Sequence, residues 1–396
     1  MRKLSALFYV LFASLVLIAQ AQAQKGPVAY EEKRRQANDI AVSIVVSGLS
    51  CTCARFAEDI RNVVNDLQPD GIRVLPVLGV GGLQNLNDVL FLKGIDMGVV
   101  DEDNLRLLKR RDPQLYANIE QRVQYITKLY NSEFHVLARN DIKSYEDLRG
   151  KKVNFNLKNS QTEVTAEIVF QMLNIDVERS NYDNDDAVKR LRGAEISAMI
   201  ILTGAPQAAL ARLTSEDEVH FLPLDEQSLP GHNVEGVLNN YLPIKLTHDE
   251  YPALIPPGTS VPTIGNRALL VTYAWPEKSP RYKRLVKFVQ VFFGKIDQFQ
   301  EGARSGARHP KWSEISLASE IPGWTRFKPA VDWIAEDQKL AIAQPNGDPQ
   351  SGNIKGLFEQ YISQYAASKG HKAFSDNERQ VLFDKFQQFL ATENRQ

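Results

Sequence analysis

The stretch AVSIVVSGLSCTCARFAEDIRNVVNDLQPDGIRVLPVLGVGG, residues 41–82, contains the pattern that decides the fold. Residues 41–47 form an apolar, β-branched run typical of a buried strand, and Gly48 ends it. Apolar residues then recur every three or four positions over residues 56–67, which predicts an amphipathic helix. A second strand over residues 73–78 leads into a cluster of glycines. This order of strand, helix and strand predicts a βαβ unit on a mainly parallel sheet.

The same alternation continues downstream in two blocks. A helix over residues 85–93 and a strand over residues 96–100 complete the first block. The second block contains predicted strands at 134–138, 152–156, 196–202 and 219–222, and predicted helices at 162–173, 185–192 and 208–213. A strand over 263–273 and one long amphipathic helix over 278–299 follow. We therefore expect two α/β lobes, with the chain crossing between them near residues 130–136 and 258–266.

The two ends of the chain have their own character. Arg2 and Lys3 precede an apolar run over residues 4–18, and Ala21-Gln22-Ala23 follows, which is typical of a cleaved secretory signal peptide. The run is shorter than the roughly 20 residues of a membrane-spanning helix. We therefore predict a mature protein in the periplasm. Beyond a linker-like segment, residues 344–353, two helical patterns at 354–369 and 375–392 either pack on the parent lobe or dock a partner.

These observations predict four segments. They are a signal peptide at 1–23, a discontinuous lobe 1 at 24–135 plus 265–335, lobe 2 at 136–264, and a helical C-terminal extension at 336–396. A homodimer formed through the C-terminal helices is one alternative for the role of the extension.

Composition excludes several classes of function. The 47 basic and 48 acidic residues nearly balance, so the sequence offers no electrostatic reason to expect nucleic-acid binding. The two cysteines are too few to form a disulfide framework. There is no nucleotide-binding loop, no Gly-x-Ser-x-Gly elbow and no His-Glu-x-x-His motif, and the six histidines show no ligand spacing. We therefore predict no catalytic residues, no metal site and no cofactor.

Several segments, in order along residues 40–330, resemble one family. They read GGLQNLN at 81–87, KGIDMGVV at 93–100, ITKLYNSEFHVLAR at 126–139 and YEDLRGKKVN at 145–154, followed by 162–167 and by 253–270 with its PPGT and VPTIG motifs. The chain resembles the TAXI-type solute receptors, the binding subunits of tripartite ATP-independent periplasmic (TRAP) transporters. The extension beyond about residue 335 is not part of that pattern.

The resemblance implies a type II periplasmic-binding fold, in which two α/β lobes joined by a two-strand hinge enclose the ligand. It also implies a small organic anion, such as an amino acid or carboxylate, as ligand, and the permease subunits of a TRAP transporter as partners. Anions bind well at helix N-termini that follow the carboxyl ends of strands. We therefore expect the ligand at the strand-to-helix turns.

Polar and glycine residues of these turns are the candidate ligand contacts. The resemblance adds Tyr130, near the first crossing, although this tyrosine can equally be a core residue. Two arginines could also anchor a carboxylate, although most arginines lie at the protein surface. The candidates are Ser50, Cys51, Thr52, Cys53, Gly81, Gly82, Gln84, Tyr130, Asn159, Ser160, Gln161, Thr162, Thr203 and Gly204, with Arg55 and Arg267 as possible anion anchors. For Ser50 and Thr52, helix capping alone is an equally good interpretation.

Cys51 and Cys53 allow further interpretations. They could form a local disulfide, hold a soft metal, present a thiolate activated by a helix N-terminus, or simply be small residues in the cleft wall. A thiol-redox protein or exported enzyme on the same scaffold is therefore an alternative to the transport receptor. A ligand sensor that signals through its C-terminal helices is a second alternative.

Overall fold

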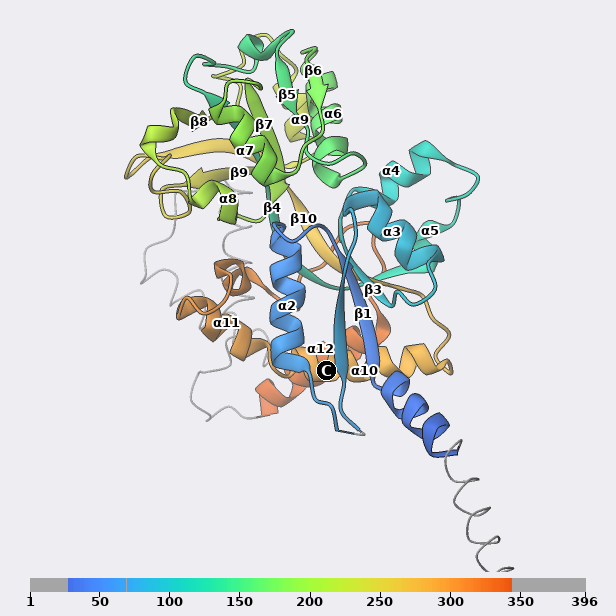
Figure 1. Ribbon diagram of the computed structural model, residues 1–396. Coiled ribbons are helices and arrows are strands. Elements are labelled where there is room, and N and C mark those ends of the chain that lie inside the picture. The colour runs from blue at the N-terminus through green and yellow to red at the C-terminus, as the bar shows by residue number, and fades with distance from the viewer. Residues whose placement is uncertain (1–27, 69, 344–396) are drawn as a thin grey trace, which may run out of the picture.

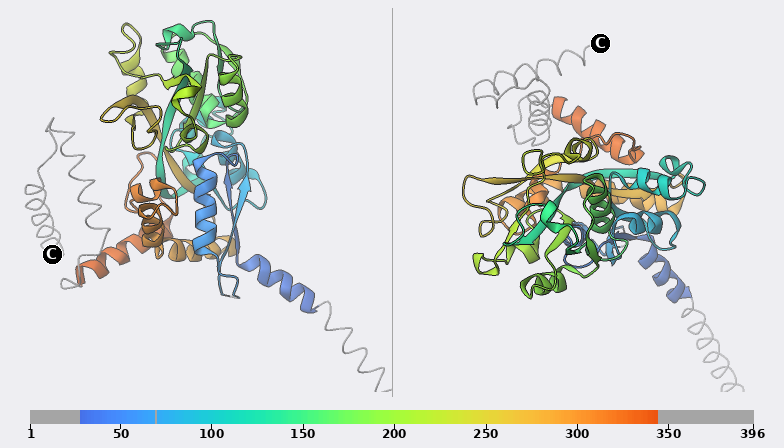
Figure 2. Two further views of the ribbon diagram at one scale, coloured as in Figure 1. Left: turned by 60° about the vertical axis from the view of Figure 1, so that its left-hand side comes forward. Right: turned by 90° about the horizontal axis from the view of Figure 1, so that it is seen from above.

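The computed structural model describes residues 28–68 and 70–343, and Figures 1 and 2 show it from three sides. The predicted signal peptide and most of the predicted C-terminal extension lie outside the described residues. Ten strands form one sheet with the order β2-β1-β3-β10-β4-β7-β5-β6, with β8 paired to β4 and β9 paired to β10. Two long strands, β4 (Val123–Arg139) and β10 (Ser260–Tyr273), run through the middle of this sheet. They connect its two halves, each of which is covered by its own helices (Figure 1).

The first half contains lobe 1. Residues 28–39 form a helix that leads into it. Its elements are β1 (Ala41–Val46), α2 (Thr52–Val64), β2 (Arg73–Leu78), α3 (Gly82–Phe91), β3 (Met97–Asp101), α4 (Asn104–Arg111) and α5 (Ile119–Arg122), joined after β10 by α10 (Pro280–Phe293), α11 (Ile296–Arg304), η3 (Pro310–Glu314) and α12 (Lys328–Ala343). Strand β1 pairs in parallel with β2 and with β3, as the βαβ pattern predicts.

The second half contains lobe 2. Its elements are η1 (Glu146–Leu148), β5 (Lys152–Asn154), α6 (Gln161–Met172), β6 (Glu178–Ser180), α7 (Asn184–Arg192), β7 (Ala198–Thr203), α8 (Ala208–Ala211), η2 (Ser215–Asp217), β8 (Val219–Phe221), α9 (Val234–Leu238) and β9 (Leu242–Thr247). Strand β5 pairs in parallel with β6 and with β7.

The centre of the sheet is antiparallel, which differs from the mainly parallel expectation. Strand β10 pairs antiparallel with β3 and with β4, and β4 pairs antiparallel with β7. The chain leaves lobe 1 along β4 and returns along β10, so the two crossing strands must run in opposite directions.

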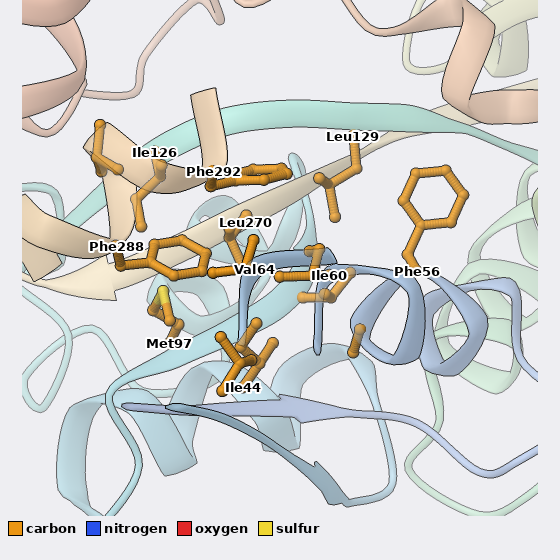
Figure 3. Packing of buried hydrophobic residues seen from close by; sticks show 14 of the residues in the cluster. Ile44, Phe56, Ile60, Val64, Met97, Ile126, Leu129, Leu270, Phe288 and Phe292 are labelled. Atoms are coloured by element: carbon orange, nitrogen blue, oxygen red, sulfur yellow. The ribbon is translucent and has the colours of Figure 1, made fainter. Parts of the chain in front are cut away.

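Helix α2 shows how the sequence pattern produces the core of lobe 1. Phe56, Ile60 and Val64 lie four residues apart on one helix face, and all three side chains are buried. They pack against Ile44 and Leu270 of the sheet, with the aromatic residues of α10 completing the cluster (Figure 3). Each fully buried side chain of this size contributes about 1.5–3 kcal/mol relative to an exposed one. Separate apolar clusters lie on the two sheet faces of lobe 2.

The long helix expected over residues 278–299 is two helices, α10 and α11, so that expectation is wrong. Helix α10 ends at Phe293, with Gly294 as its C-cap, and α11 begins at Ile296. Glycine interrupts helices readily because it loses most conformational freedom in them. The break turns Phe299 onto Trp312 with ring centroids 4.2 Å apart, so both helices bury aromatic rings in one core.

The described residues have the architecture that the sequence predicted. Two α/β lobes are joined by two crossing strands, and each lobe carries its own apolar clusters. This is the type II periplasmic-binding fold. The exact residue boundaries of the lobes stay a prediction.

Candidate functional site

A cavity of about 430 Å³ lies between the two lobes, where the strands of both end. Strands β1, β2 and β3 bring their carboxyl ends to it from lobe 1, and β5 and β7 do so from lobe 2. Its walls are formed by residues 47–51, 53, 78, 81, 85, 99, 101, 130, 132, 156, 157, 160–162, 183–185, 201–203 and 268. This position matches the rule that open α/β sheets bind ligands beyond the carboxyl ends of their strands.

Four helices begin at this cavity. Helix α2 starts after its N-cap Cys51, α3 after Gly81, α6 after Ser160 and α7 after Asp183, and all four cap residues line the cavity. The positive end of each helix dipole therefore faces the cavity, which favours a negatively charged group of a ligand there.

The lobes also touch each other directly beside the cavity. On one side, Gln161 of α6 accepts a hydrogen bond from Asn104 Nδ2 at 2.6 Å and donates one to Asp103 Oδ1 at 3.1 Å. On the other side, Asn184 Nδ2 donates to Ser50 Oγ at 2.9 Å. These contacts hold the two lobes together in the described arrangement.

Gly82 makes one of these contacts sterically possible. Its φ of +53° is in the left-handed region, and a Cβ atom there would lie 2.8 Å from Gln161 Oε1 and 2.9 Å from Gln161 N. A glycine at this position therefore allows the start of α3 to approach the start of α6.

Beside the crossing strands, Tyr130 and the Thr52–Thr203 contact connect the lobes. The Thr203 hydroxyl donates to Thr52 Oγ1 at 3.2 Å, and Thr52 donates in turn to the Gly204 carbonyl at 2.7 Å. Tyr130 is buried, lines the cavity and packs against Phe56 with ring centroids 4.7 Å apart. A Cβ atom on Gly204 would lie 2.9 Å from this tyrosine ring, so Gly204 provides space for Tyr130.

Cys51 and Cys53 are joined by a disulfide in the cavity wall. Cys51 is the N-cap of α2, and its sulfur accepts a hydrogen bond from the Cys53 backbone N–H. The Ser47 backbone N–H donates to Cys53 Sγ at 3.3 Å, which links the disulfide to the end of β1.

The structure brings most of the predicted contact residues together but not all of them. Nine line the cavity, namely Ser50, Cys51, Cys53, Gly81, Tyr130, Ser160, Gln161, Thr162 and Thr203. Thr52, Gly82 and Gly204 lie beside it and pack the lobes against each other. Gln84 and Asn159 are exposed and are not among the lining residues; Gln84 donates to Asp88 on its own helix.

The two predicted anion anchors are also outside the cavity lining. Arg55 is about half exposed and lies within 3.5 Å of Asp59. Arg267 pairs with Glu102, with 2.6 Å between Nη1 and Oε2. Both guanidinium groups therefore already have acidic partners.

Sequence reasoning missed several cavity residues, above all Asp101, Ser132 and Asn184. Asp101 is the last residue of β3, directly after the apolar run that predicted that strand. Applying the strand-end rule to this strand, as to its neighbours, would have found it. Asn184 follows β6, a three-residue strand with two exposed residues, which carries no apolar signal.

Comparison with known proteins identifies the family. Several solved structures are similar at low sequence identity. SsuA, an alkanesulfonate-binding protein from Xanthomonas axonopodis pv. citri, is 11% identical, with a TM-score of 0.40 over 77% of this chain and 93% of that chain. An ancestral arginine-binding protein is 13% identical, with a TM-score of 0.39 over 69% and 97%. The regulatory domain of CcmR from Synechocystis PCC6803 is 14% identical, with a TM-score of 0.39 over 64% and 97%. The sequence profile of the NMT1-like family matches residues 64–299, more than half of the chain, and the chain therefore belongs to the NMT1-like family.

Proposed function

We propose that this protein is an extracytoplasmic solute receptor, which captures a small organic solute with a carboxylate between its lobes and delivers it to a TRAP-type permease. The observation that carries the proposal is the interlobe cavity at which four helices begin. Its volume of about 430 Å³ is within the range of small-molecule sites. The resemblance to TAXI-type receptors supports the permease as partner, and residues 1–23 support export to the periplasm.

The fold gives a mechanism for capture. Strands β4 and β10 connect the lobes, so a rotation about them opens or closes the cavity. Separately from this motion, none of the helices within residues 28–68 and 70–343 has the length and apolar character of a membrane-spanning segment. A solute held by helix N-termini from both lobes would favour the closed arrangement, and a permease that recognises both lobes together can then distinguish loaded from empty receptor.

The test is a thermal-shift screen of residues 24–396 against amino acids, keto acids, dicarboxylates and other small carboxylates. A solute that binds only the folded protein stabilises it by about 2.7 kcal/mol at a concentration of 100 times its Kd, so the midpoint rises with concentration. Ser50→Trp fills the cavity and should abolish the rise, whereas Leu67→Trp, at an exposed position outside it, should not. A solute that stabilises the Ser50→Trp protein equally binds elsewhere, and the proposal is then wrong.

The disulfide in the cavity wall favours a second candidate, a ligand-sensing or thiol-redox periplasmic protein. Replacing both Cys51 and Cys53 by serine separates the two functions. A receptor should keep its solute affinity after this change, whereas a thiol-redox protein should lose turnover of a dithiol substrate. Deleting residues 344–396 tests the sensor interpretation, since loss of partner association with unchanged affinity would support it.

A further inference from the structure

The disulfide between Cys51 and Cys53 borders two cavities. A second cavity, of about 520 Å³, lies against the start of α2, with Pro206 and His309 in its wall. Cys51 lines both this second cavity and the interlobe cavity, whereas Cys53 lines the interlobe cavity but not the second one. Cys51 is partly exposed and Cys53 is buried. A small thiol that enters the second cavity can therefore approach Cys51 without passing through the solute cleft.

This disulfide is poorly placed to be a structural cross-link. It joins residues two positions apart, so it closes a very short loop. The entropic stabilisation by a cross-link grows with the length of the loop that it closes, so this disulfide restrains little of the unfolded chain. Helix α2, which begins at the disulfide, is held in the core of lobe 1 by Phe56, Ile60 and Val64. Reduction of the disulfide should therefore leave the fold intact.

The surroundings of both sulfur atoms favour a thiolate after reduction. Cys51 is the N-cap of α2, and its sulfur accepts a hydrogen bond from the Cys53 backbone N–H at 3.1 Å. Cys53 Sγ accepts one from the Ser47 backbone N–H at 3.3 Å. Backbone donors and a helix N-terminus both stabilise a thiolate relative to a thiol. Among the described residues, those that line the interlobe cavity include no lysine, arginine or histidine, so no side-chain cation in its wall neutralises the charge of a thiolate.

We propose that this disulfide is a redox switch on solute binding: a small dithiol reduces it from the second cavity, and the reduced receptor binds carboxylate solutes more weakly. This inference rests on the proposed solute-binding function of the interlobe cavity. In the reduced protein the negatively charged Cys51 sulfur occupies the start of α2, where a solute carboxylate would otherwise be attracted. The reverse exchange, with the disulfide form of the reductant as oxidant, restores the neutral disulfide and the affinity.

The reaction is a thiol–disulfide exchange. One thiolate of the dithiol attacks Cys51 Sγ and forms a mixed disulfide, while the bond between Cys51 and Cys53 breaks and Cys53 leaves as a thiolate. The second sulfur of the dithiol, after losing its proton, attacks the reductant sulfur that is bonded to Cys51 and releases Cys51 as a thiolate. The dithiol gives up two electrons and two protons and becomes a cyclic disulfide. The two cysteine sulfurs take up the electrons, and each proton goes to a cysteine or to water.

The test compares the full mature chain with and without dithiothreitol, a neutral dithiol. Iodoacetamide labelling followed by mass spectrometry counts the thiols of the folded protein, and calorimetry measures the binding of L-glutamate, 2-oxoglutarate, succinate and pyruvate. Cys51→Ser/Cys53→Ser is the control, because it cannot be reduced. Cys51→Asp/Cys53→Ser places a fixed negative charge at the N-cap of α2, where aspartate is a favourable residue. Circular dichroism and the unfolding midpoint establish that all forms are folded.

Dithiothreitol should release both cysteines as thiols in the folded protein, and at least one carboxylate should then bind roughly tenfold or more weakly, as expected for two like charges a few ångströms apart. The affinity of Cys51→Ser/Cys53→Ser should not respond to dithiothreitol, and Cys51→Asp/Cys53→Ser should bind the same carboxylate more weakly than Cys51→Ser/Cys53→Ser.

The proposal is overturned if the folded protein yields no thiols, if its affinity is the same in both redox states, or if the aspartate and serine variants bind equally well; the receptor function then stands. If none of the four probes binds either form, this proposal is also overturned, and the wider solute screen decides the receptor function separately.

Discussion

The buried imidazole of His135 makes a strong prediction about acid stability. His135 is fully buried on β4, with Nδ1 2.8 Å from the Glu133 carbonyl and Nε2 2.8 Å from the Tyr251 hydroxyl. A carbonyl only accepts, so Nδ1 must carry the proton and Nε2 must accept from Tyr251. That hydroxyl in turn accepts from the Gln207 backbone N–H at 2.8 Å. A second proton on Nε2 would leave two donors facing each other.

The magnitude follows from the pKa of this histidine. Burial lowers the pKa of His135 to about 4, against an ordinary value of about 6.5. Because the folded state binds this proton less readily than the unfolded state, stability is fully present above pH 6.5 and is lost as the pH falls toward 4. Between pH 7.5 and pH 4.5 the single-site relation gives a loss of about 2.5 kcal/mol from His135 alone.

The assay is urea unfolding of the wild type and of His135→Phe, followed by circular dichroism at both pH values. The phenylalanine variant should be less stable at each pH but should lose about 2.5 kcal/mol less between them. Phe221→Leu is the matched control, because Phe221 packs on the same ring with centroids 5.8 Å apart and does not titrate. Its pH dependence should equal that of the wild type. If His135→Phe also keeps the wild-type pH dependence, the assignment of a neutral buried imidazole is refuted.

Two further predictions concern the close approach of Gly82 to Gln161 and the buried ion pair between Lys311 and Glu133. Gly82→Ala places a Cβ atom 2.8 Å from Gln161 Oε1, so the solute affinity measured by calorimetry should fall about tenfold. Gly94→Ala is the control, because Gly94 also has a positive φ but has open space around it. This control should leave the solute affinity unchanged. Lys311→Met removes the cation 2.6 Å from the buried Glu133 carboxylate, which should lower the free energy of unfolding by about 3–5 kcal/mol. Adding Glu133→Gln to this variant should restore most of the lost stability, because no unpaired buried charge then remains. If the double variant is no more stable than Lys311→Met, the pairing is contradicted.

Sequence patterns predicted strands at the centre of the sheet and also β2 at one of its edges, but missed β6 and β9. Strands β1, β3 and β7 are continuous apolar runs, so their burial is visible in the composition. Strand β6 has three residues and β9 exposes two of its six, including Lys245. Such strands are stabilised by pairing with strands that are distant in the sequence, and the composition of a short strand does not reveal that pairing.

Some features of the candidate site could be predicted from the sequence, and others could not. The start of α6 was found to within one residue because a polar segment precedes the helix, and the structure shows that Ser160 of this segment is its N-cap. Contacts between the lobes were not predictable, because the distance from Gln161 to Asn104 depends on the relative position of two separately folded units. Asp101 was missed for a related reason, since an aspartate at a strand end becomes unusual only when its burial is known.

Some of the residues that hold the lobes together do not line the cavity, and this separates two effects on binding. Gly82, Thr52 and Asn104 hold the lobes against each other without lining the cavity, whereas Asp101 lines it without contacting lobe 2 through any hydrogen bond described for it. The apparent dissociation constant is the intrinsic value divided by the fraction of closed protein. Loss of a closing contact therefore weakens every solute by the same factor and leaves the order of affinities unchanged. A change at a residue that contacts the solute should instead reorder the solutes, so the ratio of the affinities for two solutes distinguishes recognition from closure.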